Sequence, residues 1–248
     1  MNKKSIIGLI VIGFFSLGII PSAAQTNTWY NQYTDRSVNL YDVWFVNENL
    51  GFIAGEGATI LKTTDGGIHW SYINVSTVAV DQYNNPVALY SICFIDENVG
   101  FACGKKEIVI KTTDGGATWT DGGPISGGSL GTPLGDPDIN ADSSGNFWYT
   151  CMYSSGLMAA KSTDGGASFG SQVSVHTSWG DDKVLAAIDA TGGAYDGYIY
   201  VCWKDFWQSD FNLYCARSTN GGISFGSPVN ICTTCGSEQS QAPFPAVA

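Results

Sequence analysis

Charged side chains are scarce in this sequence. Asp, Glu, Lys and Arg together make up 13% of the 248 residues, about half of the usual share. The chain has 11 Lys and Arg against 22 Asp and Glu, a formal net charge of -11 at pH 7. Because nucleic acid binding rests on basic side chains that neutralise phosphates, nucleic acid and anionic membrane surfaces are unexpected partners. Few charges combined with 31 glycines also exclude a coiled coil or a helix bundle.

Histidine is also rare, and the sequence lacks the common motifs for binding cofactors. The two histidines, His69 and His176, lack neighbours at the spacings typical of metal ligands, so we predict no metal site. The sequence contains neither a phosphate-binding loop nor a dinucleotide-binding glycine motif. We therefore predict that the protein has no cofactor.

Long apolar runs are confined to the beginning of the chain. Residues 6–20 carry no charge, follow a basic pair at 3–4 and precede three small residues at 22–24. This order is typical of a secretory signal peptide over residues 1–24. Its run of about 15 apolar residues is short for a bilayer span, which needs about 20. We expect cleavage, no membrane span in the mature chain 25–248, and secretion to the periplasm or the extracellular space.

One nine-residue motif occurs four times in the rest of the sequence. It begins with a basic residue, continues through Asp or Asn and two glycines, and ends with an aromatic residue; the copies start at Lys62, Lys111, Lys161 and Arg217. The Asp or Asn positions are separated by 49, 50 and 56 residues. A period near 50 with short strand-like runs is typical of propeller blades. We therefore predict an all-β propeller of four-stranded blades over residues 25–248.

The motif has a structural explanation. Its Asp side chain can accept a backbone N–H from two residues further on, and the glycine pair supplies the positive φ that a tight turn requires. The aromatic residue begins the next strand and can pack into the blade. We expect these residues to stabilise a turn: Asp65, Gly67, Trp70, Asp114, Gly116, Trp119, Asp164, Gly166, Phe169, Asn220, Gly222 and Phe225.

The repeated motif resembles the Asp-box, also called the bacterial neuraminidase repeat (BNR). This repeat occurs in sialidases, xyloglucan-cleaving propellers, sortilin-type receptors and photosystem II assembly propellers. The first two repeats align without a gap, residues 41–52 on 90–101, and most resemble the photosystem II assembly type. The later two resemble the sialidase-like superfamily. The resemblance implies that the Asp-boxes lie at the blade periphery, away from the ligand face.

The length of the repeat region bears on the number of blades. Residues 25–248 supply about 4.5 blades at this period, whereas the resembling families close rings of about six to eight. Residues 243–248 resemble the first strand of a further blade, and residues 28–30 resemble an outer strand. We therefore expect four to five blades that form part of a larger ring. A complete five-bladed ring is the alternative.

Arginine is too scarce to build a sialidase site from this chain alone. Resemblance to sialidases implies three arginines around the substrate carboxylate, because a guanidinium binds a carboxylate in a bidentate manner. This sequence has only Arg36 and Arg217, and Arg217 replaces the lysine of the motif. The site therefore cannot be assembled from these residues.

A propeller glycosidase also needs two carboxyl groups about 5 to 10 Å apart. The best-placed pairs are Asp136 with Asp138 and Asp181 with Asp182. An Asp-Pro-Asp sequence and an Asp-Asp pair before a strand are also common in turns that have only a structural role. The catalytic residues of an enzyme are therefore unassigned.

Two functional classes remain. The first is a secreted non-catalytic propeller that presents a recognition surface for a protein or a glycan. The second is an exo-acting glycoside hydrolase of the sialidase-like type, with catalytic residues partly outside this chain. Four tryptophans could stack on sugars, although such residues more often pack between blades: Trp148, Trp179, Trp203 and Trp207. We favour the first class because the arginines are missing.

Seven cysteines in an exported chain indicate disulfide bonds. The pairs at 93 and 103 and at 202 and 215 flank predicted hairpins, and the pair at 232 and 235 can close a small loop. The predicted bonds join Cys93 to Cys103, Cys202 to Cys215 and Cys232 to Cys235, and Cys151 stays free.

Overall fold

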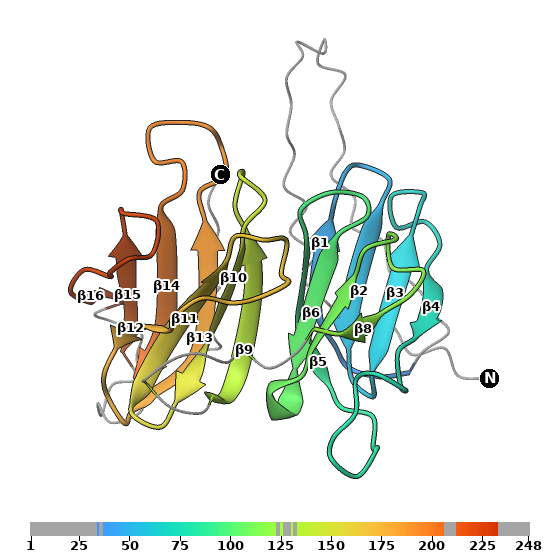
Figure 1. The fold of residues 1–248 in the computed structure, drawn as a ribbon, viewed down its shortest axis with the longest axis horizontal. Helices are drawn as coiled ribbons and strands as arrows, with labels where there is room; N and C mark the ends of the chain where they lie inside the picture. Colours follow the sequence, from blue (N-terminus) through green and yellow to red (C-terminus); the bar gives the residue numbers. More distant parts are fainter. Residues whose placement is uncertain are drawn as a thin grey trace.

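The computed structural model describes residues 34, 37–122, 125, 130, 133–205 and 212–232. Within these ranges the chain forms sixteen strands and a short 3-10 helix, η1 (Lys105–Glu107). The strands form four four-stranded sheets, each built from antiparallel strands in chain order (Figure 1). The prediction of an all-β propeller with four-stranded blades is confirmed. No helix in this part of the chain is long and apolar enough to cross a bilayer.

We number the sheets as blades 1 to 4 in chain order. Blade 1 contains β1 (Leu40–Phe45), β2 (Gly51–Gly55), β3 (Thr59–Thr63) and β4 (Ser71–Asn74). Blade 2 contains β5 (Leu89–Phe94), β6 (Gly100–Gly104), β7 (Val109–Thr112) and β8 (Thr120–Asp121). Blade 3 contains β9 (Pro133–Ala141), β10 (Phe147–Tyr153), β11 (Gly156–Ser162) and β12 (Val173–His176). Blade 4 contains β13 (Asp181–Ile188), β14 (Ile199–Asp205), β15 (Leu213–Ser218) and β16 (Val229–Cys232).

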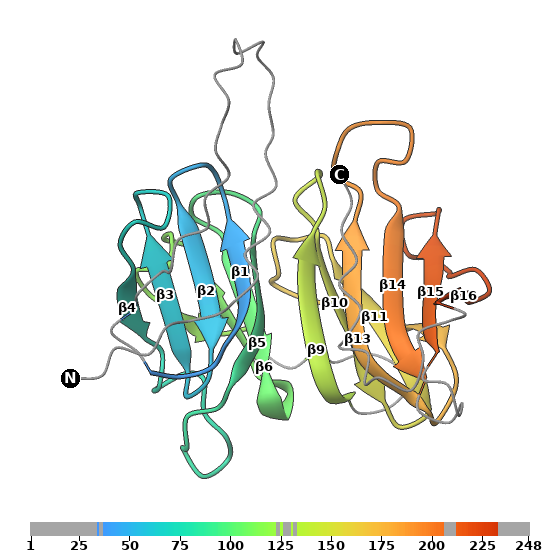
Figure 2. The same ribbon diagram turned by 180° about the vertical axis from the view of Figure 1, so that it is seen from behind.

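The blades stand side by side in chain order (Figures 1 and 2). Their first strands contact one another, β1 with β5, β5 with β9, and β9 with β13. Strand β6 holds only buried residues, because blades 1 and 3 pack against its two faces. A short apolar run without alternation is typical of a strand in this position.

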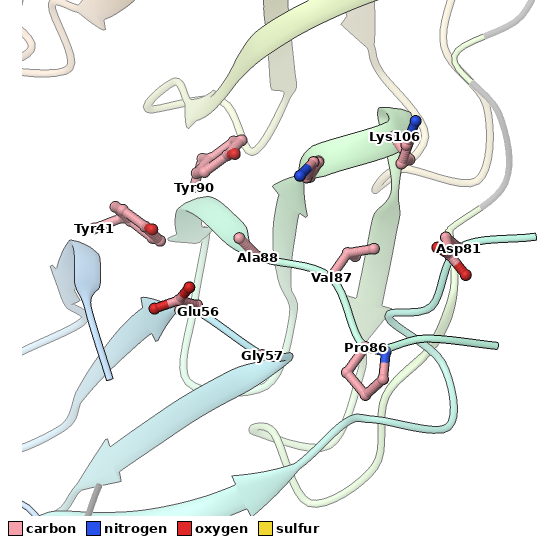
Figure 3. Close-up of a pocket in the computed structure, with 10 residues that line it drawn as sticks. Tyr41, Glu56, Gly57, Asp81, Pro86, Val87, Ala88, Tyr90 and Lys106 are labelled. Atoms are coloured by element: carbon pink, nitrogen blue, oxygen red, sulfur yellow. The ribbon is translucent and has the colours of Figure 1, made fainter. Parts of the chain in front are cut away.

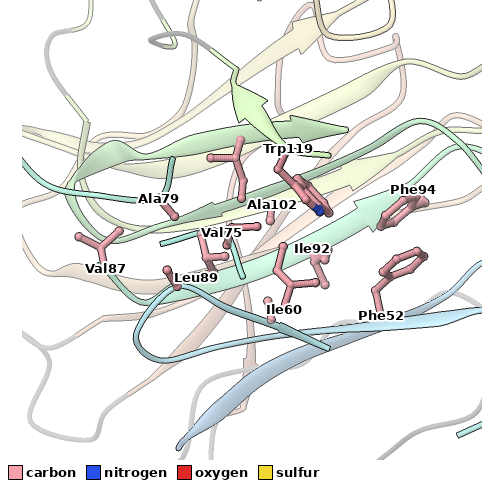
Figure 4. Close-up of a cluster of buried hydrophobic side chains, with 13 residues drawn as sticks. Phe52, Ile60, Val75, Ala79, Val87, Leu89, Ile92, Phe94, Ala102 and Trp119 are labelled. Atoms are coloured by element: carbon pink, nitrogen blue, oxygen red, sulfur yellow. The ribbon is translucent and has the colours of Figure 1, made fainter. Parts of the chain in front are cut away.

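Most of the hydrophobic core lies between the blades. Between blades 1 and 2, apolar side chains of both sheets interdigitate (Figure 4). The Phe52 ring of blade 1 stacks on the Phe94 ring of blade 2, with centroids 4.0 Å apart. Trp119 meets Phe94 edge-on at 6.1 Å. Because aromatic pairs bury large areas, this interface supplies much of the packing energy that joins the two blades.

Antiparallel order gives each blade two distinct edges. The Asp-box turns join third to fourth strands, on the same edge as the loops between first and second strands; we call this the Asp-box edge. The opposite edge holds the starts of the first strands, the loops between second and third strands, and the connections between blades; we call this the connection edge. Side chains from all four blades can therefore meet at the connection edge.

The cysteine positions differ in part from expectation. Cys202 lies directly opposite Cys215, as the hairpin pattern indicated. Cys93 instead lies opposite Phe101, and Cys103 opposite Ser91, because the hairpin turns one residue earlier than expected. These four cysteines and Cys151 are free thiols in the structure. Cys232 is disulfide-bonded in the structure. Its predicted partner, Cys235, lies outside the described residues, so that pairing stays a prediction.

Candidate functional site

The Asp-boxes form one turn geometry in all four blades. In blade 1 the Asp65 carboxylate accepts hydrogen bonds from the Thr63 hydroxyl, at 2.8 Å, and from the His69 N–H, at 2.9 Å. The N–H of Gly67 donates to Thr63 Oγ1 at 2.9 Å. The carboxylate therefore accepts the N–H of the residue four positions further along the chain. The sequence pattern had predicted the residue two positions further along. Blades 2, 3 and 4 repeat these bonds around Asp114, Asp164 and Asn220.

The hydrogen bonds hold the pKa of the Asp-box carboxyls low. The His69 N–H lowers the pKa of Asp65 to about 2, and the Thr118 hydroxyl and N–H lower that of Asp114 to about 2. Both carboxylates are therefore ionised throughout the neutral range, with their oxygens committed to the turn. This geometry gives the Asp-boxes a structural role.

The Asp-boxes of blades 2, 3 and 4 are also each half of a joint with the preceding blade. The Lys62 ammonium donates to the Gly115 carbonyl of blade 2 at 2.7 Å, and Lys111 donates to the Gly165 carbonyl of blade 3 at 2.6 Å. An aromatic residue of each second strand packs on the second glycine of the next box: Phe52 on Gly116, Phe101 on Gly166 and Trp148 on Gly222. We call this arrangement the blade joint. Sequence reasoning missed the lysine, although its recurrence at 62, 111 and 161 was a usable signal.

The candidate tryptophans have different environments. Trp148 is buried in a blade joint, and Trp203 is fully buried between blades 3 and 4. Trp179 is 81% exposed in the connection before β13. Trp207 lies outside the described residues, as does Arg36. Of the described candidates, only Trp179 offers an open face to a ligand.

The carboxyl groups proposed from the sequence make hydrogen bonds that join neighbouring strands. The buried Asp138 carboxylate accepts the N–H of Ala186 in blade 4 at 2.7 Å and the Ser91 hydroxyl of blade 2 at 2.8 Å. Asp181 is buried against the His176 ring, whose Nδ1 lies 2.8 Å from its carboxylate. Each group thus holds neighbouring strands together.

Asp136 and Asp182 come together at the connection edge. The pKa of Asp182 is raised by burial and by the nearby Asp136 carboxylate. Lys183 neutralises part of the charge, with Nζ 3.3 Å from Asp136. Asp136 and Lys183 both have positive φ, 46° and 56°, a backbone conformation uncommon outside glycine.

Buried polar groups link the first strands in the same way from blade to blade. Asp42 Oδ2 accepts the N–H of Ile92 at 2.8 Å, and Ser91 Oγ accepts the N–H of Ile139 at 3.2 Å. Asp138 makes the equivalent bond to blade 4. The Ser91 hydroxyl also lies 3.1 Å from Asp42 Oδ2. Burial raises the pKa of Asp42 from 3.8 to about 6, and the nearby Asp138 carboxylate adds to the rise.

Every first strand carries an irregularity near its start. The register of β1 shifts at Tyr41 and that of β5 at Tyr90, and β9 and β13 shift around Asp136 and Lys183. Such bulges redirect side chains and are frequent beside functional sites. The Tyr41 and Tyr90 rings meet edge-on at 5.2 Å. We call Tyr41, Tyr90, Asp136 and Lys183 the bulge row.

Tyr90 stands in the middle of the bulge row. Burial raises its pKa, Tyr41 and Asp136 add to the rise, and Lys183 opposes it. These effects place Tyr90 within electrostatic reach of blades 1, 3 and 4. The bulge row therefore crosses all four blades at the connection edge.

A groove of about 430 Å³ opens beside the two tyrosines, between blades 1 and 2 (Figure 3). Carboxylates and ammonium groups line it together with apolar residues: Tyr41, Glu56, Gly57, Asp81, Pro86, Val87, Ala88, Tyr90, Lys105 and Lys106. Two consecutive residues of η1, Lys106 and Glu107, have positive φ of 64° and 62°. Positive φ at consecutive non-glycine residues is a strain typical of functional loops. The groove and the bulge row together form the candidate site.

No metal-binding group is found within the candidate site. Among the residues that the structure describes, no three His, Cys, Asp or Glu side chains are placed to hold an ion. What the site offers is aromatic rings, charges of both signs and an open groove. These are means of binding a ligand by contact and hydrogen bonding.

Comparisons with known proteins place the fold. The family model described as photosystem II assembly factor YCF48 matches residues 21–128, which include blades 1 and 2. The search of curated proteins finds no match. The resemblance of the first two blades to the photosystem II assembly type is thereby confirmed.

Solved structures share the architecture at low sequence identity. The structure of YCF48 bound to D1 peptide has a TM-score of 0.55 and 19% identity over 79% of this chain and 55% of that chain. YCF48 from Cyanidioschyzon merolae has a TM-score of 0.55 and 17% identity over 81% of this chain and 59% of that chain. A protein of unknown function from Dyadobacter fermentans has a TM-score of 0.51 and 10% identity over 77% of this chain and 64% of that chain. This chain spans little more than half of the two YCF48 chains.

These similarities agree with the four Asp-box turns and with the four sheets of consecutive antiparallel strands. The chain is therefore a β-propeller of the BNR type, similar to YCF48.

Proposed function

We propose that this protein is a non-catalytic propeller that recognises a segment of a protein partner at the connection edge. The observation that carries the proposal is the groove between blades 1 and 2, with Tyr41 and Tyr90 at its side. Tyr41 is 45% exposed although its ring already contacts Tyr90. Tyrosine is among the residues that contribute most binding energy in protein interfaces, because its ring buries area while its hydroxyl stays hydrogen-bonded.

The character of the groove favours a peptide over a small apolar molecule. Glu56 and Asp81 supply carboxylates, and Lys105 and Lys106 supply ammonium groups, around the apolar residues 86–88. An extended peptide offers backbone donors and acceptors along its whole length, which suits a groove with both charges. The family model covers the two blades that form the groove, and one YCF48 structure holds a peptide. Both support the proposal.

The proposal predicts a peptide ligand that depends on the two tyrosines. Phage-displayed random peptides selected on the purified protein should yield binders, and their Kd can be measured by fluorescence anisotropy. Tyr41→Ala and Tyr90→Ala should each weaken binding by about tenfold or more, because each removes an interface aromatic. Tyr195→Ala is the matched control, since Tyr195 is 57% exposed in the loop between β13 and β14, at the Asp-box edge. Equal affinity in all three variants, or a selection without binders, contradicts the proposal.

A glycan is the alternative ligand, and the exposed Trp179 favours it. An indole with 81% of its surface open can stack on a sugar ring. A sialidase-like hydrolase would cleave a fluorogenic sialoside or glucan, with activity reduced in Trp179→Ala. Cleavage of such a substrate by the purified protein would replace the recognition proposal with the enzyme.

We further propose that the protein is secreted after cleavage behind Ala24, with two disulfide bonds, Cys202 to Cys215 and Cys232 to Cys235. The direct opposition of Cys202 and Cys215 supports one of them. The secreted protein should begin at Gln25 by mass spectrometry. Under denaturing conditions it should show three free thiols, those of Cys93, Cys103 and Cys151. The Cys202→Ala variant should show four, because Cys215 loses its partner. More than three free thiols in the unmodified protein contradict the two bonds.

A further inference from the structure

The groove between blades 1 and 2 is lined by two equivalent turns that carry opposite charges. The turn between β2 and β3 holds Glu56 and Gly57. The turn between β6 and β7 holds Lys105 and Lys106 at the corresponding positions of the repeat. All four residues line the groove. Blade 2 therefore presents two ammonium groups where blade 1 presents one carboxylate.

The carboxylates of the groove already have partners within the chain. Asp81 accepts the N–H groups of Tyr83 and Asn85, each at 2.9 Å. These bonds, above all the one from Asn85, hold the pKa of Asp81 below its usual value. Glu56 accepts the side-chain amide of Asn39 at 3.2 Å. Both acidic groups of the groove thus contribute to the structure of their own loops.

The two lysines of the groove have no such partners. In the described part of the chain, neither ammonium makes a hydrogen bond or an ion pair, although the Lys106 charge adds a small part to the lowered pKa of Asp81. Burial raises the pKa of the adjacent Glu107, and neither lysine opposes this effect. The other described cations all have contacts: Lys62, Lys111, Lys161, Lys183, Lys204 and Arg217.

The backbone holds the lysine turn against the wall of the groove. The Lys105 N–H donates to the Ala88 carbonyl at 2.9 Å, and Ala88 itself lines the groove. The two segments lie so close that a Cβ built on Gly104 would overlap the same carbonyl. This contact fixes the position from which both lysine side chains extend.

Lys106 has a backbone conformation that favours glycine. Its φ is 64°, and its counterpart in blade 1 is Gly57 with a φ of 65°. The same turn is therefore built with glycine in one blade and with lysine in the other. A Cβ makes this conformation unfavourable, and such strain is found mainly where the side chain has a function. The conformation of Lys106 is a second reason, besides its lack of a partner, to assign it a ligand.

We propose that the groove selects a peptide with an acidic residue, whose carboxylate binds Lys105 and Lys106 while an apolar residue of the same peptide lies against Tyr41 and Tyr90. This inference rests on the proposed function and names the chemistry of its ligand. Figure 3 shows the tyrosines towards one end of the groove and Lys106 towards the other, with Ala88 between them. An extended peptide along the groove reaches both ends.

The charge of the whole protein makes this preference specific to the groove. The chain carries a net charge of -11, so its long-range field repels an acidic peptide. An acidic residue therefore gains affinity only through direct contact with the unpartnered ammonium groups. Such contacts are charge-assisted hydrogen bonds, which are stronger than those between neutral groups.

Phage-displayed peptides selected on the purified protein test the preference. The binders should share an Asp or Glu at a fixed distance from an apolar residue. In a synthetic binder, the amide version of that acidic residue should weaken binding about fivefold, as expected for a partly exposed ion pair. Fluorescence anisotropy measures the Kd, and the difference between the two peptides should shrink as salt is added.

Lys106→Gly separates binding from stability. Glycine is the residue of blade 1 at this position, so the variant should unfold at a higher urea concentration than the unmodified protein. It should nevertheless bind the acidic peptide about fivefold more weakly, because an ammonium group is lost. Ile223→Glu is the matched control: it changes the net charge by the same amount at a 77% exposed position in the Asp-box of blade 4, and should leave the Kd unchanged.

Exchanging the charges tests direct contact. The double variant Lys105→Glu, Lys106→Glu should reject the acidic peptide and bind a version in which lysine replaces its acidic residue. Peptides that need Tyr41 and Tyr90 but bind the lysine variants with unchanged affinity would overturn this inference and leave the proposed function standing. A selection without binders, or binders indifferent to both tyrosines, would overturn the proposed function and this inference with it.

Discussion

Gly166→Ala is expected to destabilise the protein by about 3 kcal/mol. The residue has φ of 76°, which costs an alanine roughly 1–2 kcal/mol. A Cβ at this position would also overlap the Phe101 ring of the preceding blade. Relieving such an overlap costs a further 1–3 kcal/mol or so in a packed core. Urea unfolding followed by tryptophan fluorescence measures the difference.

The adjacent glycine supplies the control. Gly165 has a similar φ of 65°, but a Cβ there would meet nothing within 4 Å. Gly165→Ala should therefore lower the free energy of unfolding only by the cost of the positive φ, about 1–2 kcal/mol. The difference between the variants isolates the contact across the blade joint. Equal losses in the two variants would show that the joint at Gly166 contributes nothing beyond the turn.

Asp42→Asn is expected to stabilise the protein near neutral pH by about 1–3 kcal/mol. The pKa of Asp42 is raised from 3.8 to about 6, mainly by burial, so the ionised carboxylate is unfavourable in the folded state. Asparagine keeps one oxygen that can accept the N–H of Ile92, but its NH2 group replaces the oxygen that accepts the N–H of Val43, which lowers the gain. It is neutral at every pH, so it places no negative charge next to Asp138.

The sign of the pH dependence follows from the raised pKa. Between about pH 4 and 6 the folded chain binds the Asp42 proton more tightly than the unfolded chain does, so this group's stabilisation is present below pH 3.8 and is lost as the pH rises through about 6. The gain from Asp42→Asn should therefore be small near pH 4, grow up to about pH 6 and stay constant above. Free energies of unfolding measured for both proteins across this range provide the test. A difference that is independent of pH contradicts the raised pKa.

Local patterns in the sequence predicted the blades well. The Asp-box depends on residues within nine positions of one another, so a turn with two glycines and an Asp or Asn could be read directly from its repeats. The four sheets follow because each blade joins consecutive strands, and no long-range pairing had to be guessed. The opposition of Cys202 and Cys215 came from the same local reasoning.

Contacts between blades could not be predicted in the same way. The partners of Lys62 and Ser91 lie about 50 residues away, and each pair depends on how one sheet packs on the next. The shift of the Cys93 hairpin shows the same limit on a smaller scale, since one residue in the turn changes every pair of the ladder. Asp138, one of the carboxyls considered as a catalytic candidate, makes one of these contacts between blades.

The groove was missed because its residues are dispersed along the chain. Tyr41 and Tyr90 are 49 positions apart, and Asp81 and Lys106 come from two different loops. The alignment of the first two repeats does place Tyr41 on Tyr90. That coincidence was the available signal, but the bulges at the two strand starts and the contact of the two rings are seen only in the structure.

Photo-crosslinking tests most directly whether the connection edge is the recognition surface. A photoreactive phenylalanine analogue replaces Tyr41 in one protein and Tyr195 in another, and each is irradiated with a peptide selected on the unmodified protein. Mass spectrometry then reports the adducts. The proposed function predicts a peptide adduct at position 41 and none at position 195, at the Asp-box edge. An adduct at 195 without one at 41 would place recognition on the opposite edge and contradict the account.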